Sequence, residues 1–177
     1  MTAAPRPGTK TSRRWLWLAS SALVASACGA STEPEPTPEG RRVVLGTGEA
    51  DFEPIDGEPR LPLIAGVQGG FHVWASFLVY GFRAARAEMV LETRVEDDPE
   101  ASMVMRARLP LREKLDADGQ PVFSFAGFPA QVYDARCAQD KRVSVHLSLT
   151  DSDGYTVDDT RYCITQIAEI YRTETCD

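Results

Sequence analysis

Histidine is scarce in this chain, and the common sequence motif around a nucleophilic serine is absent. Only two histidines occur, His72 and His146, and no Gly-x-Ser-x-Gly motif is present. A Ser-His-Asp triad needs a histidine beside an activated serine, so little remains from which to build one. The spacings between Cys137, Cys163 and Cys176 match no zinc pattern. We therefore expect no catalysis, no metal site and no cofactor.

Basic residues are outnumbered, with 19 Lys and Arg against 26 Asp and Glu and a net charge of −7. The first 27 residues hold four bases and no acid, which leaves 15 bases against 26 acids in the remainder, a net of −11. A protein that binds nucleic acid needs a basic face for the phosphates. The acidic remainder therefore argues against a nucleic-acid partner, and it favours cationic partners or simple solubility.

Long hydrophobic runs are also missing. The apolar stretch Trp15 to Ala27 carries no charge, but as a helix it would reach only about 20 Å. The hydrocarbon core of a bilayer is roughly 30 Å thick, so this stretch is too short to span it. Bases precede it and small residues end it, which is the order of an export signal. The adjacent Arg13 and Arg14 resemble a twin-arginine motif, so both the general and the twin-arginine export routes stay open.

The end of this signal carries a distinctive motif. Val24-Ala-Ser-Ala-Cys28-Gly29 resembles the lipobox of bacterial lipoproteins, in which small residues precede an invariant cysteine. The resemblance implies cleavage before Cys28, a diacylglycerol on its thiol and acylation of the new amine. Each buried methylene contributes about 0.8 kcal/mol, so two or three chains anchor a protein stably. Gly29 in place of aspartate implies the outer membrane if the cell is Gram-negative.

The residues after Cys28 predict a tether. Pro34, Pro36 and Pro38 alternate with acids and small polar residues, and the segment has nothing apolar to bury. Proline and charge repulsion extend such a segment. The predicted layout is a signal peptide over 1–27, a lipidated cysteine and tether over 28–40, and one domain over 41–177.

The domain has the pattern of short strands. Val143 to Thr150 alternates strictly between apolar and polar residues, which predicts a half-buried strand. The turn signal Asp151 to Gly154 follows, and then a second predicted strand over Thr156 to Ile167. Together the two strands predict a β-hairpin. Phe71 to Phe82 is almost continuously apolar and predicts a central strand covered on both faces. Further strands are expected at Arg42 to Leu45, Arg60 to Ile64, Glu88 to Glu96, Ser102 to Leu109, Val122 to Phe125 and Gln131 to Tyr133.

This succession of strands and turns predicts a single all-β sandwich. Its order and size resemble immunoglobulin-like and fibronectin-type domains, and the final hairpin resembles the last two strands of such domains. The segment Gly46 to Trp74, which includes the string Gly66 to Trp74, resembles the start of uncharacterised bacterial surface lipoproteins. None of these resemblances implies an activity.

The cysteines predict one disulfide. If Cys28 is lipidated, three cysteines remain in an oxidising compartment. A two-residue turn would place Ser152 opposite Tyr155 and Cys163 opposite Ser144. This register favours a Cys137–Cys163 bridge, whereas Cys137–Cys176 stays open. A closed loop of this length would contribute roughly 3 kcal/mol.

Three local strings remain as candidate sites. Gln68-Gly-Gly-Phe-His72 predicts a tight turn, with a polar pocket of Gln68 and His72 as the functional alternative. Asp151 to Gly154, with Asp158 and Asp159 beyond it, resembles part of a calcium loop but has no closing glutamate, so we expect a hairpin turn with solvated acids, and a weak calcium site stays open as the alternative. Trp74 lies in an apolar stretch and is expected in the core.

These observations favour a non-enzymatic envelope lipoprotein that displays an interaction domain for an unknown protein or glycan. Two other classes stay open. A carbohydrate-binding accessory module would show a row of exposed aromatics on one sheet face. A small envelope hydrolase or metal-binding protein would gather acids around His72 in a pocket.

Overall fold

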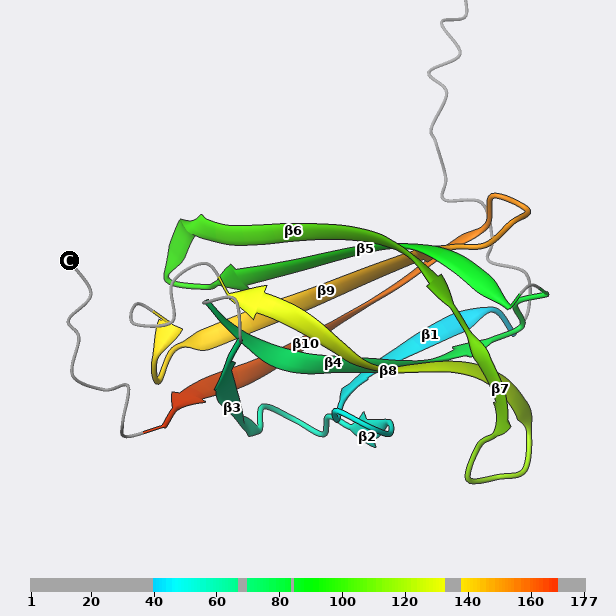
Figure 1. Cartoon of the computed structure of the whole chain (residues 1–177), viewed down its shortest axis with the longest axis horizontal. Coiled ribbons are helices and arrows are strands. Elements are labelled where there is room, and N and C mark those ends of the chain that lie inside the picture. The colour runs from blue at the N-terminus through cyan, green and yellow to red at the C-terminus, as the bar shows by residue number, and fades with distance from the viewer. Residues whose placement is uncertain (1–39, 67–69, 84, 133–137, 169–177) are drawn as a thin grey trace, which may run out of the picture. The chain divides into compact units, whose positions relative to one another are not determined.

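The computed structural model describes residues 40–66, 70–83, 85–132 and 138–168 (Figure 1). The predicted signal, Cys28 and the tether up to residue 39 lie outside these residues, as do Gln68, Cys137 and Cys176. No helix within the described part of the chain is long and apolar enough to cross a membrane. The strands are β1 (Arg42–Thr47), β2 (Glu53–Pro54), β3 (Arg60–Ala65), β4 (Phe71–Tyr80), β5 (Arg86–Val95), β6 (Asp98–Pro110), β7 (Arg112–Leu115), β8 (Pro121–Val132), β9 (Arg142–Thr150) and β10 (Thr156–Ile167).

The strands form two sheets that β3 joins. In the first sheet, β8 pairs along one edge of β4, and β1 and β3 share the other edge. Strand β2 extends this sheet beyond β1, and β7 extends it beyond β8. The second sheet has the order β10-β9-β5-β6 and is antiparallel throughout. Strand β3 pairs with β4 in the first sheet and, in parallel, with β10 in the second.

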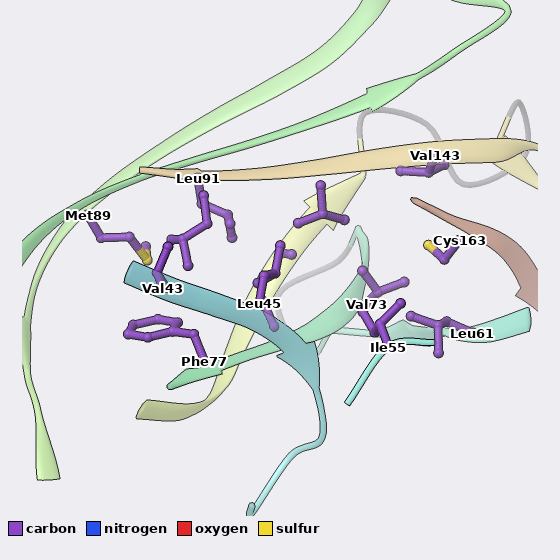
Figure 2. Close-up of a cluster of buried hydrophobic side chains, with 14 of the residues drawn as sticks. Val43, Leu45, Ile55, Leu61, Val73, Phe77, Met89, Leu91, Val143 and Cys163 are labelled. Carbon is purple, nitrogen blue, oxygen red and sulfur yellow. The ribbon is translucent and has the colours of Figure 1, made fainter. Parts of the chain in front are cut away.

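The core lies between the two sheets (Figure 2). Val43 and Leu45 of β1 and Phe77 of β4 face Met89 and Leu91 of β5, and all five are buried. Burial of each such side chain contributes roughly 1.5–3 kcal/mol relative to its exposure. The arrangement confirms the predicted fold class, an all-β sandwich.

The strand predictions are largely confirmed, with two differences. The alternating strand β9 buries every second residue, and β4 is covered on both faces, as expected. The predicted strand Val122 to Phe125 and residues 131–132 of the predicted strand Gln131 to Tyr133 are instead parts of the single strand β8, because a β-bulge at Gly127 lets the strand continue; Tyr133 lies outside the described residues. The short strands β2 and β7 carry too weak an apolar pattern to be predicted from the sequence.

The register of the β9–β10 hairpin differs from the prediction by one residue. Thr150 pairs with Thr156 and Cys163 with Val143, rather than with Ser144. The amide of Asp151 donates to the carbonyl of Tyr155, so the turn has three residues instead of two. Gly154 ends it with a φ of 82°, the left-handed conformation that such turns place on glycine.

Candidate functional site

His72, one half of the predicted polar pocket, is buried on the outer face of the first sheet. Its side chain is 8% exposed and its ring lies edge-on to Trp74, with 4.4 Å between the ring centres. Its Nε2 atom has no hydrogen-bond partner among the described residues. Burial lowers the pKa of His72, and the carboxylate of Glu49 partly offsets this effect. Gln68 lies outside the described residues, so the pocket of Gln68 and His72 stays a prediction.

Trp74 is not in the core, where it was expected. Its side chain points to the same outer face as His72 and is half-buried, because β4 buries Val73 and Ala75 between the sheets instead. Within the described residues, no three His, Cys, Asp or Glu side chains are grouped as metal ligands would be. Among the described residues, the acid that acts on the charge of His72 is Glu49.

Cys163 is buried between the sheets with a free thiol, and burial raises its pKa to about 11. Its predicted partner Cys137 lies outside the described residues, so the Cys137–Cys163 disulfide stays a prediction. The neighbouring residue Ala138 is fully buried, and its carbonyl accepts a hydrogen bond from Thr165. Thr165 lies two residues from Cys163 on β10, so the chain around position 138 passes close to Cys163.

The Asp151 turn was expected to carry solvated acids, and this expectation is wrong for Asp151 itself. Its carboxylate accepts hydrogen bonds from the amides of Asp153 and Tyr155, each 2.9 Å long. Its other oxygen forms an ion pair with Arg41 at 3.2 Å, and the two side chains are 1% and 11% exposed. The carboxylate therefore stabilises the turn and holds Arg41, the residue before β1, against it. Both carboxylate oxygens already have partners within the protein.

Aromatic side chains do not form an exposed row in the described part of the chain, where each is buried or half-buried. Three tyrosines lie beneath arginines at 3.9–4.1 Å from guanidinium carbon to ring centre: Tyr155 under Arg41, Tyr80 under Arg42 and Tyr162 under Arg142. A guanidinium on a ring covers the face that a sugar would stack on. These rings therefore offer no open platform of the kind that the carbohydrate-binding alternative predicts.

A cleft opens on the outer face of the first sheet, where β8 bulges. Ser76 of β4 lies opposite the bulge; its hydroxyl donates to the carbonyl of Gly48 at 2.6 Å and accepts from the amide of Gly127 at 3.2 Å. Gly127 has a φ of 76°, and a Cβ there would lie 2.2 Å from the carbonyl oxygen of Glu49. The bulge thus lets the loop between β1 and β2 lie directly on β8.

The cleft beside this loop has a volume of about 420 Å³. Ser124 and Ala126 of β8 line it at the sheet, the loop contributes Glu49 and Asp51, and β7 contributes the side that carries Arg112 and Lys114. Since β4 and β7 pair with opposite edges of β8, the acids of the loop and the bases of β7 face each other across β8. The cleft therefore has an acidic wall at the loop and a basic wall at β7, where Arg112 and Lys114 outnumber the one acid, Glu113.

The basic wall belongs to a longer feature that the sequence analysis missed. Strands β6 and β7 are separated by Leu111 alone, and the amide of Leu111 continues the pairing by donating to the carbonyl of Ala85 at 2.8 Å. Leu109 and Leu111 point into the core, so the residues of even number point outward. Figure 1 shows this continuous stretch running from β6 into β7. We call its four outward bases the basic ribbon: Arg106, Arg108, Arg112 and Lys114.

All four side chains of the basic ribbon are exposed, and none forms an ion pair with any residue that the structure describes. Other bases of the domain behave differently. Arg41, Arg60, Arg94, Lys141, Arg142 and Arg161 all pair with carboxylates. Arg42, Arg83 and Arg86 are likewise exposed and form no ion pair within the described residues, but they lie outside the β6–β7 stretch, where four such bases follow one another.

Comparisons with known proteins add little to this description. No protein-family model matches the chain, and no curated protein matches its sequence. A solved structure of murine CRIg is similar to the chain at 8% sequence identity, over 72% of this chain and 99% of that one, with a TM-score of 0.29.

Proposed function

We propose that this chain is a lipid-anchored protein of the bacterial envelope whose β-sandwich is an interaction domain. The anchor is Cys28, which follows a basic, short and apolar signal in a lipobox-like motif. The Pro- and Glu-rich segment up to residue 40 serves as the tether between the membrane and the domain. We propose no catalysis for the domain.

The basic ribbon is the observation that supports an interaction role. Four bases that point outward along the continuous stretch of β6 and β7, and that form no ion pair with a described residue, create a local positive potential on a protein whose net charge is −7. The overall acidity led us to expect cationic partners. The basic ribbon instead favours an anionic partner at this edge. Exposed charges act over a Debye length of about 8–10 Å, so the basic ribbon acts on a partner beside it, whereas acids farther away are screened.

The anchor is tested by labelling cells with an alkyne analogue of palmitate and separating membranes from soluble proteins. The unaltered chain should carry the label and sediment with membranes, whereas Cys28→Ala should lose both properties. Cys176→Ala is the matched control, since it removes another cysteine and should keep both the label and the membrane attachment. Label and membrane attachment that persist in Cys28→Ala would contradict the anchor.

A further inference from the structure

We propose that the free edge of β6 binds an acidic, extended peptide segment of a partner protein, which adds to the sheet as a further strand beside Arg106 and Arg108. This inference rests on the proposed interaction function and specifies the partner for it. Three observations carry it: an open strand edge, unpaired bases along that edge, and a surface chemistry that disfavours a second copy of the same chain.

The first observation is the open edge. β6 spans Asp98–Pro110, and it pairs with β5 alone among the described strands. Its other side therefore presents backbone amides and carbonyls that can pair with an added strand. Addition of an extended peptide to such an edge is an established mode of peptide recognition, in which main-chain hydrogen bonds provide affinity and side chains provide specificity.

The second observation is the charge on the outward face of this edge. Arg106 and Arg108 are two residues apart, so their side chains share one face. Glu88 lies opposite Arg108 on β5 but forms no ion pair with it. An added strand would place its own alternate residues next to these arginines, where carboxylates form favourable cross-strand pairs. Val104, on the same face, is 51% exposed and would suit an apolar residue.

The third observation concerns selectivity. Bases and proline on an edge strand are devices by which proteins prevent pairing with copies of themselves. Arg106 and Arg108 would meet the same arginines in a second β6, and Pro110 ends the edge with no amide to donate. The charges that repel a second copy attract an acidic strand. Such an edge is therefore selective for an acidic partner segment.

The basic ribbon also gives the bound segment a direction. From Val104 to Lys114 the chain extends about 33 Å at 3.3 Å per residue, and Arg112 and Lys114 at its end form one wall of the cleft. A segment that follows the basic ribbon would thus reach the cleft, where Glu49 and Asp51 form the other wall. A lysine or arginine at that end of the segment would suit these acids.

The test uses the full chain, purified in detergent, and fluorescent dodecapeptides. One peptide alternates glutamate with valine, a second alternates lysine with valine, and a third has the first sequence with N-methyl groups on alternate residues. The Glu-Val peptide should bind, and its affinity should fall as salt is raised. The Lys-Val peptide should not bind. The N-methylated peptide keeps the charge but cannot form the strand hydrogen bonds, so it should bind at least tenfold more weakly.

Protein variants locate the site. Arg106→Gln with Arg108→Gln should weaken binding of the Glu-Val peptide at least tenfold, and Arg106→Lys with Arg108→Lys should restore most of it. Arg60→Gln with Lys141→Gln is the matched control, since it removes two exposed bases that already have carboxylate partners. Amide hydrogen exchange in β6 should slow when the peptide is bound.

Equal binding of the N-methylated peptide, or equal loss in the control pair, would overturn strand addition at β6. Absence of binding by the Glu-Val peptide would overturn the choice of an acidic partner. These outcomes are independent of the labelling of Cys28, so a failed anchor and a failed binding edge are distinguishable.

Discussion

Ser76 donates a hydrogen bond to the carbonyl oxygen of Gly48 at 2.6 Å, across 28 residues of sequence, and thereby ties the loop between β1 and β2 to the sheet. The hydroxyl is fully buried and also accepts from Gly127 in the bulge of β8. One side chain therefore satisfies two backbone groups that would otherwise be buried without partners. The acidic wall of the cleft depends on this contact, because Glu49 directly follows Gly48.

Ser76→Ala should destabilise the domain by about 1–3 kcal/mol, since both backbone groups would lose their partner in a buried site. Urea unfolding measures the change. Ser148→Ala is the matched control, because Ser148 is half-buried on the outer face of β9 and should change stability by no more than about 0.5 kcal/mol. Equal stability of the two variants would contradict the role of Ser76.

Gly127→Ala should destabilise more than Gly119→Ala. Both glycines have φ values near 75°, so alanine meets the same backbone strain at each. A Cβ at position 127 would also lie 2.2 Å from the carbonyl oxygen of Glu49, whereas nothing lies within 4 Å at position 119. We expect the clash to add about 1–3 kcal/mol to the loss in urea unfolding. Equal losses would show that the loop does not rest on the bulge.

Arg41→Ala should cost about 3–5 kcal/mol, because it leaves the buried carboxylate of Asp151 without its countercharge. Arg60→Ala breaks an ion pair whose side chains are 61% and 49% exposed, so it should cost at most about 1 kcal/mol. Thermal or urea unfolding compares the two. A small cost at Arg41 would mean that Asp151 is accessible to water.

His72 should make stability fall as the solution is acidified. Its folded pKa lies below the unfolded value of 6.5, so the unfolded chain binds the proton more readily. The contribution is fully present above about pH 6.5 and is lost as pH falls through the folded pKa. Unfolding free energies at about pH 7.5 and pH 5 should therefore differ less in His72→Gln than in the unaltered chain. An identical difference in both proteins would contradict burial of the neutral ring.

Cys163 should resist alkylation in the folded, fully reduced chain. Burial excludes the reagent and raises the pKa to about 11, so little thiolate exists near pH 8. Iodoacetamide followed by peptide mass mapping should label Cys163 only after unfolding in urea. The same mapping without prior reduction tests the predicted Cys137–Cys163 bridge: a linked peptide pair would support the bridge, and its absence would leave Cys163 as the free thiol that the structure shows. Rapid labelling of Cys163 in the folded chain would contradict its burial.

Sequence periodicity predicts the sandwich well because its core uses simple alternation. The hairpin register shows both the power and the limit of that signal. Val143 and Val145 point inward, as do Val157 and Cys163, and inward residues must lie opposite inward residues. This rule fixes the observed register, whereas the assumption of a two-residue turn led to a register one residue away.

The candidate site was less accessible from the sequence. The alternate bases Arg106, Arg108, Arg112 and Lys114 are visible in the printed sequence, but a net charge averaged over the chain conceals them. That they share one outward face follows only when β6 and β7 are known to be continuous. The contact of Ser76 with Gly48 depends on how the loop folds over the bulge, and no local pattern encodes it.

Site-specific photo-cross-linking in intact cells tests the proposed function most directly. A photoreactive amino acid at position 106, on the basic ribbon, should give a cross-linked partner in the membrane fraction. The same amino acid at position 60, an exposed site on β3, should not. Cys28→Ala should move the cross-linked species out of the membrane fraction if the partner is itself soluble. Equal cross-linking at positions 106 and 60, or none at 106, would contradict an interaction domain that acts through the basic ribbon.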